Sequence, residues 1–82
     1  MFYVRIYVYL KRTVADPQGK TVKQALHSLD FSEVEDIRIG KYIEIKIKTK
    51  DKAEAEKKIK DMCQKLLVNP IVEEYTFAIE KI

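Results

Sequence analysis

The chain has 82 residues and a mass of 9.7 kDa; 46% of the residues are hydrophobic and 35% are charged. This length allows one small domain, residues 1–82, and excludes an enzyme that needs a separate cofactor-binding domain. The two glycines are too few for the Gly-rich turn of a dinucleotide-binding unit. The composition is typical of a folded globular protein rather than of a disordered tail or a fibrous repeat.

The net charge is +3, and the basic excess lies in residues 41–65, which carry nine basic and five acidic residues. Such a stretch could attract phosphates, but its lysines are equally typical of a solvated strand and helix, and we favour that interpretation. The single cysteine, Cys63, excludes an internal disulfide and a Cys-based metal cluster, and it favours a reducing, cytoplasmic location. Neither a signal peptide nor a membrane-spanning run is recognisable, so we expect no membrane partner.

Residues 2–11 alternate between apolar and polar positions, which predicts a strand with one face against a core. The apolar positions are Phe2, Val4, Ile6, Val8 and Leu10. The opposite positions are Tyr3, Arg5, Tyr7, Tyr9 and Lys11.

Residues 12–20 are predicted to form a loop, with a turn at Asp16-Pro17-Gln18-Gly19. Thr21 followed by Gln24 resembles a capping box, so we expect a helix to begin at Thr21 and to run to about residue 29. Its apolar positions recur at helical spacing: Val22, Ala25, Leu26 and Leu29.

The β-prone runs 34–39 and 42–48 flank Gly40-Lys41 and predict a hairpin. Its register is open: a two-residue loop would place Ile39 opposite Tyr42 and conflict with the apolar alternation, whereas a bulge or a three-residue loop would return Ile37 and Ile39 to the core side.

Asp51 with Glu54 forms a second capping box, and a helix is predicted from there to about Leu67, ended by Asn69-Pro70. Residues 71–80 alternate again and predict a fourth strand. The order β-α-β-β-α-β predicts a ferredoxin-like two-layer α+β sandwich, with two helices on one face of a four-stranded antiparallel sheet.

The chain carries few residues suited to catalysis. His27, the only histidine, lacks a neighbour that could orient it as a base, and we interpret it as a solvent-facing helix residue. Cys63 lies on the apolar side of the second predicted helix, where a thiol is usually an inert small hydrophobe. We therefore expect no catalytic residue and no metal or cofactor site in this chain.

The sheet face opposite the helices is the more informative feature. It is predicted to carry tyrosines interleaved with basic residues, namely Tyr3, Tyr7, Tyr9 and Tyr42 with Arg5, Lys11 and Lys46. Such a face can be an RNA-binding platform, although the Gly/aromatic signature of that class is missing from residues 41–48. It can also be a protein interface, or a set of tyrosines that are merely exposed. We favour the interface and keep a small RNA-binding module as the alternative.

Three segments together resemble the PurS family, the small subunit of phosphoribosylformylglycinamidine synthase in purine biosynthesis. They are LKRTVADPQGKTVKQAL (10–26), VEDIRIGKYIEI (34–45) and CQKLLVNPIVEEY (63–75). The resemblance covers almost the whole chain in order and spacing. Departures are small: Asp30 stands where the family often has a helix-ending glycine, and Val68 where alanine is usual. Asp tolerates the left-handed conformation expected at residue 30.

The resemblance implies a non-catalytic subunit that assembles a PurQ-type glutaminase with a PurL-type, ATP-dependent synthetase and supports ammonia transfer between them. It implies that the complex uses ATP, Mg and glutamine while this chain binds no cofactor, and that the chain forms homodimers or homotetramers.

Several positions match family motifs residue by residue. These are Asp16, Gln18 and Gly19, then Arg38, Gly40 and Lys41, then Asn69, Glu73 and Tyr75. Turns and a helix end account for Gly19, Gly40 and Asn69. Arg38 and Lys41 are the best candidates for partner contacts. With Tyr3, Tyr7, Tyr9 and Tyr42 they make up the predicted interface.

Overall fold

The computed structural model describes all residues from 1 to 82. Its elements in chain order are β1 (Phe2–Leu10), α1 (Pro17–Ser28), β2 (Lys41–Ile47), α2 (Lys52–Met62), the π-helical turn η1 (Cys63–Leu67) and β3 (Glu73–Lys81). The three strands form one antiparallel sheet in the order β2-β1-β3. The α+β class is therefore correct, but the sheet has three strands, and the fourth strand predicted at 34–39 is absent.

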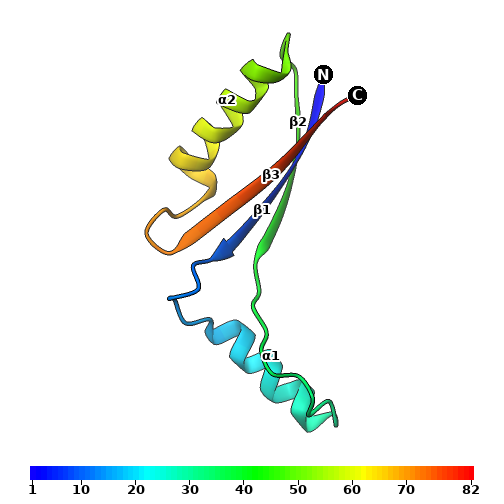
Figure 1. Ribbon diagram of the computed structural model, residues 1–82, viewed down its shortest axis with the longest axis vertical. Helices are drawn as coiled ribbons and strands as arrows, with labels where there is room; N and C mark the ends of the chain where they lie inside the picture. Colours follow the sequence, from blue (N-terminus) through cyan, green and yellow to red (C-terminus); the bar gives the residue numbers. More distant parts are fainter.

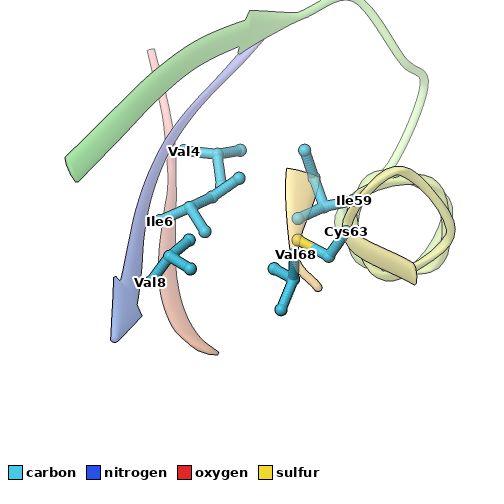
Figure 2. Packing of buried hydrophobic residues seen from close by; sticks show 6 residues of the cluster. All are labelled: Val4, Ile6, Val8, Ile59, Cys63 and Val68. Atoms are coloured by element: carbon cyan, nitrogen blue, oxygen red, sulfur yellow. The ribbon is translucent and has the colours of Figure 1, made fainter. Parts of the chain in front are cut away.

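The alternation predicted for the strands is observed. Phe2, Val4, Ile6 and Val8 of the central strand are buried, with exposed fractions of 5% or less. Figure 2 shows Val4, Ile6 and Val8 pointing at Ile59 and Cys63 of the helical layer and at Val68. One helix therefore covers the inner face of the sheet. The inner rows of the outer strands are only half-buried: Ile43, Ile45 and Ile47 on β2, and Tyr75, Phe77 and Ile79 on β3.

The start of α2 agrees with the sequence, because the Asp51 carboxylate accepts a hydrogen bond from the backbone N–H of Glu54 at 2.8 Å. At its other end the helix widens into η1, after which Val68 adopts an extended conformation. Asn69 then caps the corner through its side-chain oxygen, which accepts from the N–H of Ile71 at 3.1 Å.

The first helix begins four residues earlier than predicted. Asp16, not Thr21, is its N-cap, and Pro17 occupies the first helical position, where the missing N–H costs nothing. The predicted turn at 16–19 is thus the first turn of α1. Asp30 ends the helical region with φ 74°, the left-handed conformation expected from the sequence.

The position of α1 differs most from the prediction. It does not join α2 over the sheet; it projects beyond the end of β1, and residues 31–40 return beside it before entering β2 (Figure 1). We call residues 11–40 the arm. No glycine has a positive φ, so the chain passes from the arm into β2 without the tight turn that a hairpin at Gly40-Lys41 requires.

Candidate functional site

The candidate site residues lie on two surfaces: the base of the arm and the outer face of the sheet, opposite α2. The base of the arm joins three parts of the chain. Asp16 Oδ1 accepts from the N–H of Gly19 at 2.9 Å, and Oδ2 accepts from the N–H of Ile39 at 2.7 Å. These bonds, followed by the positive charge of Arg38, hold the pKa of Asp16 below its usual range. The start of α1 is thereby attached to residues 31–40, which we call the returning segment.

Arg38 contributes to the same junction. Its guanidinium donates to the carbonyl oxygens of Lys11 at 3.0 Å and Val14 at 2.8 Å. The sequence indicated no folding role for this arginine, but in the structure its side chain holds the loop between β1 and α1. A further role as a partner contact remains a prediction.

Lys41 lies beside the corner that precedes β3. Its Nζ is 3.4 Å from Glu73 Oε2, while Glu73 Oε1 accepts from the N–H of Asn69 at 2.8 Å. Glu73 thus links the start of β2 to the corner between η1 and β3. The Lys41 side chain remains 61% exposed, so it is still available to a partner.

Gly19 and Gly40 are required for close approach rather than for turns. A Cβ at Gly19 would overlap the carbonyl oxygen of Ile37, which lies against α1. A Cβ at Gly40 would lie 2.5 Å from the carbonyl oxygen of Val8. Both glycines let two backbone segments touch where the arm leaves the sheet.

The outer face of the sheet carries the predicted tyrosines. Tyr7, Tyr9 and Tyr42 are 45%, 39% and 49% exposed, and the rings of Tyr7 and Tyr42 lie 5.2 Å apart across strands. The Arg5 guanidinium lies 4.6 Å from the centre of the Tyr3 ring and 3.1 Å from Glu80 Oε1. Three exposed tyrosines, interleaved with a charge pair, make this face a candidate for contact with another protein.

Tyr3 and Glu44 are coupled on this face. Hydrogen bonding to Glu44, together with partial burial, raises the pKa of Tyr3 to about 12. The hydroxyls of Tyr3 and Tyr42 in turn lower the pKa of Glu44. These interactions connect β1 and β2, as Arg5 and Glu80 connect β1 and β3.

The two residues considered for catalysis lie apart and have structural partners. His27 Nε2 is 2.8 Å from the carbonyl oxygen of Val34, which fastens the returning segment to α1. Cys63 is fully buried between α2 and the sheet, and burial raises the pKa of its thiol. The structure does not bring them together, since one lies on the arm and the other in the core (Figure 1).

Comparison with known proteins decides the family. The family model described as PurS, phosphoribosylformylglycinamidine (FGAM) synthase, matches residues 3–81. The chain belongs to the PurS family. It is 45% identical over 82 residues to the PurS subunit of Bacillus subtilis strain 168, covering 100% of this chain and 96% of that protein. The resemblance to PurS identified in the sequence is confirmed, and the chain is a subunit of phosphoribosylformylglycinamidine synthase in purine biosynthesis.

Solved structures of the PurS family agree with the fold. The B. subtilis PurS structure superposes with a TM-score of 0.91 at 46% identity, over 99% of this chain and 100% of that one. A chain of the PurLQS structure from Thermotoga maritima superposes with a TM-score of 0.87 at 31% identity, over 98% and 99%. The projecting arm is therefore a feature of the fold shared with these relatives, because such scores over nearly the whole chain require it. No helix of this chain has the length and apolar character needed to cross a membrane.

Proposed function

We propose that the chain is the non-catalytic assembly subunit that bridges a PurQ-type glutaminase and a PurL-type, ATP-dependent synthetase in the cytoplasm. The observation that carries the proposal is the likeness, over nearly its whole length, to a chain of the T. maritima PurLQS structure. The engagement of His27 and Cys63 in structural contacts supports a role without catalysis. ATP, Mg and glutamine then belong to the larger subunits, and this chain holds their active sites in register for ammonia transfer.

Reconstitution tests the proposal. Glutamine-dependent synthesis by the larger subunits should fall at least tenfold without this chain, whereas synthesis from added ammonia should persist, because ammonia from solution bypasses the glutaminase. Full glutamine-dependent activity in its absence would contradict the proposal.

The proposal includes self-association, and the shape of the chain supports it. The radius of gyration is 16.4 Å, against about 12 Å expected for a compact domain of this length. The accessible surface of 6265 Å² exceeds the value expected for a compact protein of this mass by roughly 1,100 Å². That surplus is comparable with the ~800 Å² that each partner buries in a standard interface.

The arm and the sheet of two copies complement each other. The arm exposes Val22 (37%), Leu29 (65%) and Phe31 (49%), while one helix leaves the inner rows of the outer strands half-covered. In the predicted four-stranded fold, residues 34–39 would complete the sheet, and α1 would complete its helical layer. The bonds at the base of the arm hold it away from its own sheet. We therefore propose that a second copy supplies both the fourth strand and the second helix.

The directions in which the backbone N–H and C=O groups point support this exchange. Two bonds, Lys11 N–H to Val72 O and Ile82 N–H to Met1 O, set the pattern between β1 and β3. Successive residues of an antiparallel strand bond alternately to the neighbour on one side and the neighbour on the other. Odd-numbered residues of β1 therefore bond to β3, and even-numbered residues bond to β2. The free edge of β2 is left with the backbone groups of Tyr42, Glu44 and Lys46. In the arm, the N–H groups of Ile37 and Ile39 are used locally. The N–H groups of Asp36 and Arg38 donate no hydrogen bond within the chain, and we infer that they pair with β2 of the second copy.

The exchange would also account for the register left open by the sequence. Ile37, Ile39, Ile43, Ile45 and Ile47 keep one uninterrupted alternation, which is that of a single straight segment rather than of a two-residue hairpin. Two such segments paired about a two-fold axis near Gly40-Lys41 place all of these residues on the inner face, with α1 of each copy beside α2 of the other.

Sedimentation velocity of the variant Leu29→Lys tests the exchange, with Ser28→Lys as the control at the neighbouring position. The wild type and the control should sediment as a dimer or a tetramer, and Leu29→Lys should shift toward the monomer. Unchanged association of Leu29→Lys, or a monomeric wild type at micromolar concentration, would contradict it.

We also propose that the outer face, centred on Tyr3, Tyr7, Tyr9 and Tyr42, contacts a larger subunit or a second dimer. Replacing Tyr7 by serine should weaken the assembled complex about tenfold while the dimer persists, because the exchange uses the opposite face and the β2 edge. Salt-sensitive binding of single-stranded RNA, lost in the same variant, would instead support the RNA-binding alternative.

A further inference from the structure

The proposed exchange allows several registers between the arm of one copy and β2 of the other, which is an edge strand of the sheet (Figure 1). In the arm, the N–H groups of Asp36 and Arg38 donate no hydrogen bond within the chain. The free groups of the β2 edge belong to Tyr42, Glu44 and Lys46. Even-numbered residues therefore face even-numbered residues. Sliding one strand by two residues preserves this rule and the inner row of isoleucines, so the backbone alone does not choose the register.

The charges on the outer side of these segments distinguish the registers. The four charged residues concerned are all exposed: Asp36, Arg38, Glu44 and Lys46. In one register Arg38 faces Glu44. The same register places Asp36 opposite Lys46, so both pairs have opposite charge. A shift of two residues one way places Asp36 opposite Glu44, and a shift the other way places Arg38 opposite Lys46. Either shift sets like charges directly against each other, which destabilises an antiparallel pair.

The side chains have free groups for the oppositely charged pairs. Neither Asp36 nor Lys46 has an ion-pair partner within its own chain. Asp36 accepts from the N–H of Ile37 through Oδ1 only, which leaves Oδ2. Arg38 donates to its two carbonyl acceptors through one guanidinium nitrogen, Nη2, so its other two nitrogens can reach a carboxylate such as that of Glu44.

The inner side of the same register is apolar. It places the two arm isoleucines opposite isoleucines of β2: Ile39 faces Ile43, and Ile37 faces Ile45. The two-fold axis then passes at Lys41, where the Lys41 side chains of the two copies approach each other. Each Lys41 Nζ lies 3.4 Å from Glu73 Oε2 of its own chain, and this carboxylate offsets the repulsion. The register therefore pairs apolar residues on one side and opposite charges on the other.

We propose that two ion pairs between copies, Arg38 with Glu44 and Asp36 with Lys46, set the register of the exchanged dimer and make a second copy of this chain the specific partner of the β2 edge. This inference rests on the proposed self-association. Because the dimer is two-fold symmetric, each pair occurs twice. A single charge reversal therefore replaces two attractions by two repulsions.

Charge reversal tests the register. Lys46→Glu and Asp36→Lys should each raise the dissociation constant of the dimer at least tenfold, because each sets like charges opposite each other at two symmetric positions. Lys48→Glu is the matched control, since Lys48 is also exposed and would face the uncharged Val34. Its dimer should dissociate like the wild type. Sedimentation velocity over a concentration series measures all of these constants.

Mixing the two reversed proteins distinguishes pairing between copies from a local effect of either substitution. In a mixed dimer the reversed arm meets the reversed strand, and the unchanged arm meets the unchanged strand, so every pair again has opposite charge. An equimolar mixture of Lys46→Glu and Asp36→Lys should therefore dissociate within about threefold of the wild type. Native mass spectrometry should show the mixed dimer as the main species.

Three results would overturn the register and leave the exchange in place. The first is a dissociation constant equal to that of the wild type for both reversed proteins, and the second is a mixture that dissociates as readily as its components. The third is a weakened Lys48→Glu dimer or a tighter Asp36→Lys dimer, since the latter would place Asp36 opposite Glu44. A wild type that remains monomeric would overturn the proposed exchange as well.

Discussion

Asp16 and Ile39 are joined by a 2.7 Å hydrogen bond between a carboxylate oxygen and a backbone N–H, although they lie 23 positions apart. The other oxygen of the same carboxylate caps α1. One side chain therefore determines both where the helix begins and where the returning segment lies. Since this junction holds the arm away from its own sheet, Asp16 links the local structure of α1 to the proposed exchange between copies.

Replacing Asp16 by asparagine should separate these two roles. Asparagine can still cap α1 through its oxygen, but its amide nitrogen cannot accept from Ile39. We expect a lower melting temperature by several degrees at pH 7, and a larger loss for Asp16→Ala, which removes both acceptors. Thermal unfolding at one fixed protein concentration measures the difference, because association also shifts the melting temperature.

The same pair of proteins should show a defined pH dependence. The folded pKa of Asp16 is lowered, so its contribution is complete above the unfolded value of about 3.9 and is lost as the pH falls through the folded pKa. Asparagine does not titrate. The stability gap between wild type and Asp16→Asn should therefore be constant from pH 7 to 5 and narrow below about pH 4. A gap that stays constant to pH 2 would show that the charge of Asp16 is not involved.

Gly19 provides a test of the close approach between α1 and the returning segment. In an ordinary helix interior, Gly→Ala stabilises by up to about 1 kcal/mol. Here the added methyl group would overlap Ile37 O, so we expect Gly19→Ala to destabilise by about 1–3 kcal/mol. Urea unfolding measures the sign, with Ser28→Ala at the exposed end of α1 as the control. A stabilised Gly19→Ala protein would mean that the segment is not held against the helix.

The sequence predicted the sheet faces well because alternation within β1, β2 and β3 depends on burial in a single chain. It failed at 34–39 because those residues have strand-like alternation but no strand to pair with in the same chain. The predicted position of α1 was wrong for the same reason, because its apolar stripe was assigned to the sheet of its own chain. The first turn of α1 was misplaced because Asp16-Pro17 fits both a turn and a helix start, and the local sequence cannot distinguish them.

The candidate site was likewise predicted only in part. The tyrosine face followed directly from strand alternation and is observed. The structural roles of Arg38 and Glu73 could not be predicted from the sequence. Arg38 contacts a loop and Glu73 contacts a corner, and the spacing of residues in the sequence does not determine where either lies. The one available signal was the coincidence of Arg38 and Asp16 in family motifs, which the structure places at one junction.

The core under α2 gives a prediction about stability. Ile59 is fully buried against Val4 and Ile6, whereas Leu66, two turns further along the same helical layer, is 83% exposed. Ile59→Ala should cost about 2–5 kcal/mol, and Leu66→Ala should change the free energy of unfolding by less than about 0.5 kcal/mol. Urea unfolding of both variants tests whether this small core is the main source of stability. Equal effects would place Leu66 in an interface that the single chain does not contain.

The coupling between Tyr3 and Glu44 gives the last prediction. Tyr3 should ionise near pH 12, because the phenol donates to a carboxylate and its ionisation would place two negative charges together. Replacing Glu44 by glutamine removes the negative charge and should bring the pKa of Tyr3 down toward 10. Ultraviolet absorbance of tyrosinate measures both titrations, with the variant Tyr3→Phe identifying the signal.

The raised pKa also determines the direction of the stability change. Because the folded value exceeds the unfolded value of about 10, the contribution of this pair is complete below pH 10 and is lost as the pH rises toward 12. The wild type should therefore lose stability over that interval more steeply than Tyr3→Phe, which has no proton to lose. Equal losses of stability for the two proteins over that interval would show that Tyr3 and Glu44 are not coupled.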